Sequence, residues 1–96
     1  MIINNLMLKL KDKNHESISN VKEELLSMKG NIEVLNDLSV ELNIRNVETN
    51  FDMLLITKFD TLEDCETYII HPFHLNVLDK IGNNVEASAV VCYERT

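Results

Sequence analysis

The order in which two hydrophobic periodicities follow one another along the chain constrains its fold most. Four runs are typical of strands: the first two alternate apolar and polar residues, and the last two carry apolar residues on both sides. Apolar residues three or four positions apart, typical of helices, occur after the first and after the third of these runs. The resulting order is β-α-β-β-α-β.

Strands are predicted over Ile3–Lys11, Leu38–Arg45, Asp52–Phe59 and Glu86–Glu94. The helix between the first two strands is capped by Asn14 or Ser17 and stopped by Lys29-Gly30. Its apolar stripe consists of Ile18, Val21, Leu25, Met28 and Ile32. A polar run from Asn46 to Asn50 predicts a loop between the second and third strands.

A second helical region follows the third strand. Thr61-Leu62-Glu63-Asp64 is a capping sequence, and Pro72 ends or kinks the helix because proline lacks an N–H. The first part is expected to bury Leu62, Cys65 and Ile69, and the part after Pro72 to bury Leu75, Leu78 and Ile81. Gly82-Asn83-Asn84 stops it.

This order predicts an α+β, ferredoxin-like fold with an antiparallel sheet in the strand order 4-1-3-2. Helices on one face explain one apolar side of each strand, but the last two strands carry apolar residues on both sides. Met7 lies opposite the leucines of the first strand and also needs cover. We therefore expect two sheets to pack face to face in a homodimer that forms an α+β barrel.

Composition and charge exclude several functional classes. Apolar residues make up 45% of the 96 residues, and nine basic against sixteen acidic side chains give a net charge of −7. An acidic chain without a long apolar run predicts neither nucleic-acid nor membrane binding. The start, Met1 to Asn5, lacks the features of a secretory leader, so we expect a cytoplasmic protein with one domain over residues 1–96.

The densest group of chemically versatile residues lies between Tyr68 and His74. A histidine can act as a base near neutral pH, and a tyrosine hydroxyl can donate to a developing oxyanion. A kink at Pro72 lets Tyr68 and His74 approach one another. His71 also has a purely structural interpretation, in which it bonds the last carbonyls of the helix, and His74 can equally be a structural histidine.

Metal and thiol chemistry are not favoured. His71 and His74 have no third ligand at a recognised spacing, so we expect neither a metal site nor a cofactor. Cys65 lies on an apolar stripe and is expected to be a buried hydrophobe, while Cys92 lies in a strand. Tyr93 is a candidate for lining a cavity or for ordinary packing.

The segment from Phe59 to Glu63, followed by Tyr68 and by His71-Pro72-Phe73-His74, resembles the stress-responsive A/B barrel (Dabb) family. The resemblance extends from about Ile3 to Glu94 and implies a ferredoxin-like fold that dimerises through its sheets. It also implies a pocket between sheet and helices. In a plant branch of this family the motif's tyrosine and second histidine, here Tyr68 and His74, serve a polyketide cyclase.

Two positions depart from the family pattern. Asn4-Asn5 stands where many members have a histidine near the start of the first strand, and Cys92 stands where many have an aspartate before the final tyrosine. An asparagine can form hydrogen bonds but cannot shuttle protons at neutral pH. These differences weaken any transferred catalytic network.

Three functions therefore remain open. The first is a homodimeric module that binds a small apolar or aromatic molecule, with binding residues His71, Phe73, Tyr93 and Asn4. The second is a cofactor-free, cyclase-like or lyase-like enzyme with His74 as general base and Tyr68 as its partner. The third is monooxygenase-like oxidation, which other dimeric α+β barrels perform.

Overall fold

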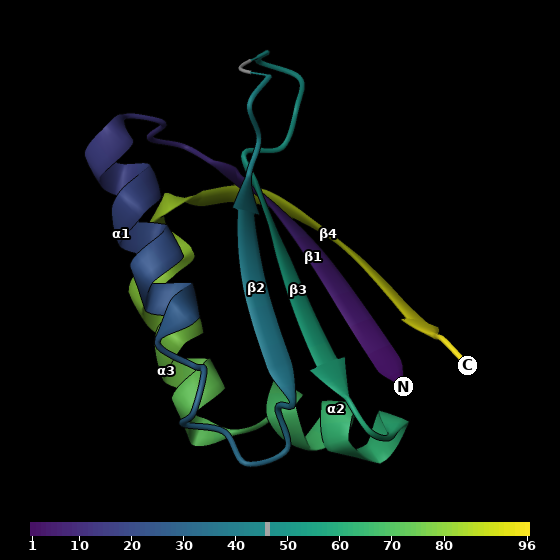
Figure 1. Ribbon diagram of the computed structural model, residues 1–96. Helices are drawn as coiled ribbons and strands as arrows, with labels where there is room; N and C mark the ends of the chain where they lie inside the picture. The colour runs from purple at the N-terminus through teal and green to yellow at the C-terminus, as the bar shows by residue number, and fades with distance from the viewer. Residues whose placement is uncertain (46) are drawn as a thin grey trace.

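The computed structural model describes residues 1–45 and 47–96. It contains one four-stranded sheet, β1 (Ile2–Leu10), β2 (Asp37–Leu42), β3 (Met53–Phe59) and β4 (Val85–Glu94). The α-helices are α1 (His15–Leu26), α2 (Leu62–Ile69) and α3 (Pro72–Ile81), and a 3₁₀ turn, η1 (Gly82–Asn84), leads into β4. In Figure 1, α1 and α3 stand next to each other beside the sheet, and α2 crosses below its lower end.

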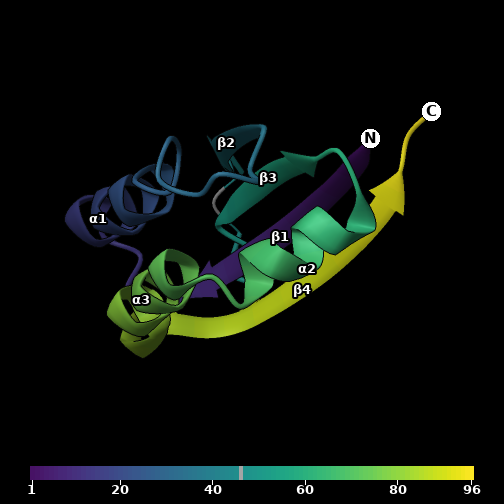
Figure 2. The same cartoon turned by 90° about the horizontal axis from the view of Figure 1, so that it is seen from below.

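The sheet has the order β2-β3-β1-β4, and all three strand pairs are antiparallel. This is the predicted ferredoxin-like arrangement, with the first and third strands in the centre. Figure 2, seen from below, shows the sheet curving from β2 to β4, with the two chain ends close together at one end.

The core lies between the helices and one face of the sheet, which we call the inner face. Alternation places Leu8 and Leu10 of β1 and Leu55 and Phe59 of β3 on this face, and all four are buried. The opposite side, the outer face, carries Met7, Leu54, Ile56 and Val91, and none of the helices that the structure describes covers it. Both sides of β3 are therefore apolar, as predicted.

Local chemistry determines where the helices begin and break. Asn14 caps α1, because its side chain accepts a hydrogen bond from the Ser17 N–H, and Thr61 caps α2 in the same way through the Asp64 N–H. Pro72 occupies the first turn of α3, where a missing N–H costs nothing. Gly30 has a φ of 84°, as expected of a glycine that ends a helical region.

Several predicted boundaries and faces are wrong. The first helix ends at Leu26, yet Met28 and Ile32 are still buried, because the turns after the helix also pack on the core. The second strand ends at Leu42 and leaves Ile44 97% exposed. Residues 47–50 belong to the predicted loop, whereas Asn46 lies outside the described residues.

The helices after β3 bury only two of the predicted side chains, Cys65 and Ile81. Leu62 is 56% exposed, and Ile69, Leu75 and Leu78 are exposed as well. The buried residues of the two helices are Cys65, Tyr68, His74, Val77 and Ile81. The break at Pro72 changes the direction of the chain, so the stripe of one helix does not continue into the next.

Candidate functional site

A cleft of about 550 Å³ lies between the inner face and the two helices α2 and α3. β1, β3 and β4 form its floor, and its walls come from the end of α2, the length of α3 and the start of η1. The lining consists of Asn4, Leu6, Leu8, Leu55, Tyr68, Ile69, His74, Leu78, Ile81, Gly82, Val85, Ser88 and Val90. Most of these side chains are apolar, which is typical of small-molecule sites.

His74 is the titratable group of this cleft with a pKa closest to neutral. It is 8% exposed, and its Nδ1 lies 2.9 Å from the carbonyl oxygen of Ile69. A carbonyl can only accept, so Nδ1 carries the proton and Nε2 keeps a free lone pair. Burial lowers the pKa of His74, the Ile69 carbonyl raises it and the neighbouring His71 lowers it. The net shift in pKa is downward, which favours the neutral ring with an unprotonated Nε2.

Tyr68 contacts His74 through its ring. The two ring centroids lie 4.3 Å apart, and the Tyr68 ring lies 5.1 Å from that of Phe59. The hydroxyl donates to the sulfur of Met28 at 3.9 Å, inside the core. Burial raises the pKa of Tyr68 above its ordinary value, and nearby Cys65 adds to this rise. The break at Pro72 thus brings Tyr68 and His74 together as predicted, but the hydroxyl is bonded away from the cleft.

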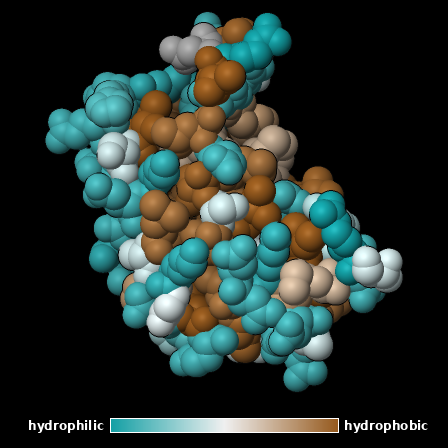
Figure 3. All heavy atoms as spheres, in the orientation of Figure 1, coloured by the Kyte–Doolittle hydropathy of each residue, from teal (hydrophilic) through white to brown (hydrophobic). Residues whose placement is uncertain are grey.

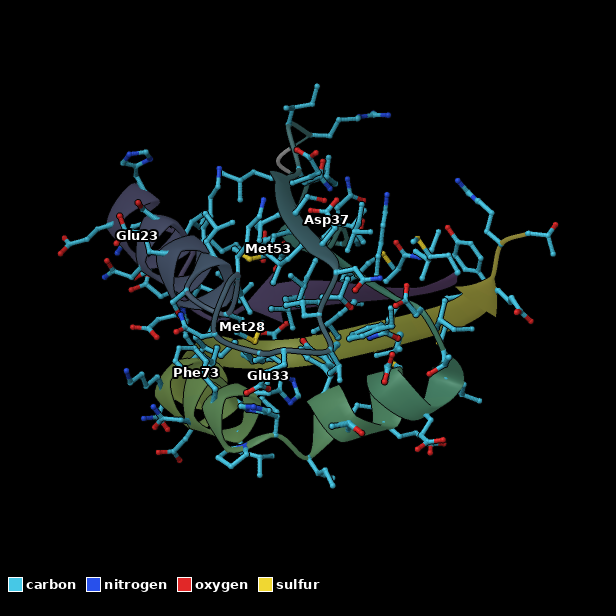
Figure 4. All side chains as sticks on the ribbon, turned by 60° about the horizontal axis from the view of Figure 1, so that its bottom comes forward. Glu23, Met28, Glu33, Asp37, Met53 and Phe73 are labelled. Atoms are coloured by element: carbon cyan, nitrogen blue, oxygen red, sulfur yellow. The ribbon has the colours of Figure 1, made fainter. Side chains whose placement is uncertain are left out.

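His71 has a structural position at the start of α3. Its Nδ1 accepts a hydrogen bond from the Phe73 N–H at 3.0 Å, and its Nε2 lies 3.3 Å from the carboxylate of Glu33. Figure 4 shows Glu33 near the start of α3, where Phe73 lies, with Met28 farther inside. His71 therefore has a structural role, but a different one from that predicted. Its side chain caps the N-terminus of the following helix and does not bond the last carbonyls of the preceding one.

The predicted site residues divide into two groups. Asn4, Tyr68 and His74 line the cleft. His71 and Phe73 lie outside its lining, and Phe73 packs against the core. Tyr93 pairs with Ile3 on the outer face, where the Arg95 guanidinium lies 5.6 Å from its ring centre. Ligand binding by each of these six residues stays a prediction.

Sequence reasoning missed Ser88 and Val90, which β4 contributes to the cleft floor. The alternation of side chains along β4 could have identified them, because it places Val90 and Tyr93 on opposite faces of the strand. Once the leucines of β1 are assigned to the inner face, pairing in the sheet places Val90 beside Leu6 and Ser88 beside Leu8. Tyr93, the residue of β4 predicted to bind a ligand, lies on the outer face.

Two further observations concern residues 1–45 and 47–96. No three histidine, cysteine, aspartate or glutamate side chains in these ranges form a group that could hold a metal ion. Within the same ranges, the helices are too short or too polar to span a bilayer.

Comparison with known proteins identifies the family. The model of the stress responsive A/B barrel domain, Dabb, matches residues 4–95. A comparison with curated proteins finds no match. Among solved structures, one from Bacteroides fragilis, described as a dimeric protein of unknown function and ferredoxin-like fold, is 26% identical, with a TM-score of 0.84 over 98% of this chain and 95% of that one.

Two further structures share the fold at lower identity. A Dabb family protein from Mesorhizobium loti is 15% identical, with a TM-score of 0.85 over 99% of this chain and 96% of that one. A hydroxynitrile lyase from Passiflora edulis is 11% identical, with a TM-score of 0.82 over 99% of this chain and 93% of that one. With the family model covering nearly the whole sequence, the chain belongs to the stress responsive A/B barrel domain family.

Proposed function

We propose that the protein is a homodimeric binding module that holds a small, uncharged and mainly apolar molecule in the cleft of each subunit. The lining of the cleft carries this proposal. It contains no lysine, arginine, aspartate or glutamate among the described residues, so an ionic ligand would lose its hydration without gaining a partner. A volume of about 550 Å³ falls within the usual range for small-molecule sites.

The polar groups of the cleft favour a ligand with one or two hydroxyl or carbonyl groups. Toward a ligand, Nε2 of His74 can accept a hydrogen bond, whereas the Ser88 hydroxyl and the Asn4 carboxamide can each donate and accept one. Asn4 and Ser88 come from the sheet and His74 comes from α3. A ligand between these walls can therefore be oriented by polar contacts at opposite sides while its apolar part contacts the leucines.

The outer face supports the homodimer. Val91 is 59% exposed, and Met7 and Tyr93 are also exposed on this face. In Figure 3, hydrophobic atoms form a band across the middle of the side seen in Figure 1 and also appear at the tip of the loop above it. Several similar structures are described as dimeric. A second copy of this chain is the partner that we propose for the outer face.

A second candidate is a cofactor-free acid–base enzyme in which His74 removes a proton from the bound molecule. The free lone pair on Nε2 in an apolar cleft favours it, because a neutral, desolvated imidazole is an effective base near neutral pH. The Asn4 carboxamide and the Ser88 hydroxyl would stabilise negative charge that develops on a substrate oxygen. Tyr68 would support His74 through its ring, as long as its hydroxyl stays bonded to Met28.

One variant and one control test the binding proposal. Native mass spectrometry of the protein as purified, followed by a thermal-shift screen, identifies ligands. We expect neutral compounds to raise the melting temperature more than carboxylates of the same size. Val90→Trp fills the cleft and is expected to abolish the shift, whereas Leu75→Trp, an exposed position of α3 outside the lining, retains it. Equal shifts in both variants, or a preference for ions, would contradict the proposal.

The enzyme candidate requires a separate test. With a ligand that turns over, His74→Gln is expected to lower kcat by about 100-fold or more while changing affinity much less. Val90→Trp should lower affinity instead. A His74→Gln protein with unchanged kcat would leave only the binding module. The monooxygenase alternative stays a prediction, because no feature of the cleft specifically favours it.

A further inference from the structure

Two cysteines that are distant in sequence meet where α2 packs on the sheet. In the strand pairing, Cys92 of β4 lies beside Asn4 of β1, and Asn4 lies beside Thr57 of β3, so the three form a row across the inner face. Cys65 lies on α2 one turn before Tyr68, and both side chains are 2% exposed. α2 packs on β3 and β1, and the Cys92 side chain lies near enough to Cys65 to affect the pKa of its thiol.

The two thiols differ in exposure. Cys65 is buried and Cys92 is exposed. Burial raises the pKa of Cys65 to about 11, and the nearby Cys92 side chain contributes to the rise. A protonated, buried thiol reacts slowly with dissolved oxidants, so Cys92 is the thiol that a reagent reaches first.

We propose that Cys65 and Cys92 are a redox-active pair that forms a reversible disulfide and ties α2 to β4 beside the cleft. The pair lies on the inner face, so a second copy packed on the outer face does not cover it. The proposal therefore does not depend on the ligand or on the dimer. It depends on the meeting of one buried and one exposed thiol between two elements that both line the cleft.

The chemistry balances with a peroxide as oxidant. The Cys92 thiol loses its proton, and the thiolate attacks one peroxide oxygen. The O–O bond breaks, the departing hydroxide takes up the proton, and the products are a sulfenic acid and water. The Cys65 sulfur then attacks the Cys92 sulfur, an S–S bond replaces the S–O bond, and the Cys65 proton leaves with the departing oxygen as a second water. The two thiols lose two electrons and the peroxide gains them. A dithiol reductant reverses the reaction by thiol–disulfide exchange.

A disulfide at this position would act on the wall of the cleft. α2 contributes Tyr68 and Ile69 to the lining, and β4 contributes Ser88 and Val90. Joining the two elements removes the opening of α2 away from the sheet, so amides of α2 are expected to exchange hydrogen more slowly in the oxidised protein. Amides of α1, which packs on β2 and α3, are expected to change little.

The test treats the whole protein with a few equivalents of hydrogen peroxide, alkylates the remaining thiols in denaturant and measures the intact mass without reductant. We expect the wild type to lose two hydrogens and both free thiols, and to yield a linked Cys65–Cys92 peptide. The melting temperature should rise by at least about 5 °C and return after reduction. Cys65→Ala is expected to gain oxygen at Cys92 instead, and Cys92→Ala is expected to stay unmodified.

Other outcomes would overturn the proposal. They are oxygen added to wild-type Cys92 while Cys65 remains fully alkylated, or disulfides between chains without a linkage within the chain. Circular dichroism establishes whether Cys65→Ala is folded, since its side chain is buried. If that variant does not fold, the linked peptide of the wild type alone decides the question.

Discussion

The ring centroids of Tyr68 and His74 lie 4.3 Å apart, although the break between α2 and α3 separates these residues in sequence. The contact fixes one side of the His74 imidazole, and the Ile69 carbonyl fixes its Nδ1. The histidine is therefore held by a ring and a carbonyl, and its other nitrogen stays available.

Removing the Tyr68 ring should destabilise the protein much more than removing its hydroxyl. Tyr68→Ala takes a large side chain out of the core and is expected to cost about 3–5 kcal/mol in the free energy of unfolding. Tyr68→Phe loses only a long hydrogen bond to a weak sulfur acceptor, so we expect a loss of at most about 1 kcal/mol. Urea denaturation measures both. A Tyr68→Phe protein that loses ligand binding or turnover while remaining stable would show that the hydroxyl leaves Met28 and acts in the cleft.

His74 should make the stability of the protein depend on pH. Its pKa is lowered from 6.5 in the folded state, mainly by burial, so the unfolded chain binds more protons between the two pKa values. The free energy of unfolding is therefore expected to be highest above pH 6.5 and to fall as the pH decreases from 6.5 to the folded pKa.

The measurement compares urea denaturation of the wild type and of His74→Gln across this pH range. Subtracting the two profiles removes the contribution of the carboxylates, which both proteins share. His15→Gln, a change at an exposed histidine, serves as the control and should keep the full wild-type profile. Parallel profiles for the wild type and His74→Gln would contradict the burial of a neutral imidazole.

The cap that His71 provides for α3 should be replaceable. His71→Ala leaves the Phe73 N–H without its partner and is expected to cost about 0.5–2 kcal/mol in the free energy of unfolding. His71→Asn restores a short side-chain acceptor and should recover most of this loss, although it cannot reach Glu33. Glu33→Gln tests the contact between His71 and the Glu33 carboxylate alone and should matter less than His71→Ala, because Glu33 is exposed. Equal losses for His71→Ala and His71→Asn would show that the contact with Glu33, not the cap, stabilises this junction.

The sequence was sufficient for the order of the elements and for the strand order, because period-two alternation and capping residues are local signals. Thr61 and Pro72 mark their helix boundaries through backbone chemistry that hardly depends on the rest of the fold. The approach of Tyr68 to His74 also followed from the proline between them.

Which side chains of α2 and α3 are buried could not be predicted from spacing. Leu62 and Ile69 are more hydrophobic than Cys65, yet the angle at which α2 crosses the sheet exposes both leucine and isoleucine and buries the cysteine. Tyr68 packs against Phe59 and donates its hydroxyl to Met28, forty positions earlier in the chain. Contacts over such distances are properties of the packed molecule and cannot be predicted from local spacing.

The proposed dimer should depend on the outer face and not on the helices. Val91→Lys places a charge on the apolar outer face and is expected to shift the protein from dimer to monomer at micromolar concentration, because an unpaired charge buried between two sheets is costly. Ile70→Lys is the matched control, since Ile70 is 71% exposed just after α2. Sedimentation velocity measures the oligomeric state of both variants, and circular dichroism establishes that both are folded. A wild type that sediments as a monomer, or a Val91→Lys protein that remains a dimer, would contradict pairing through this face.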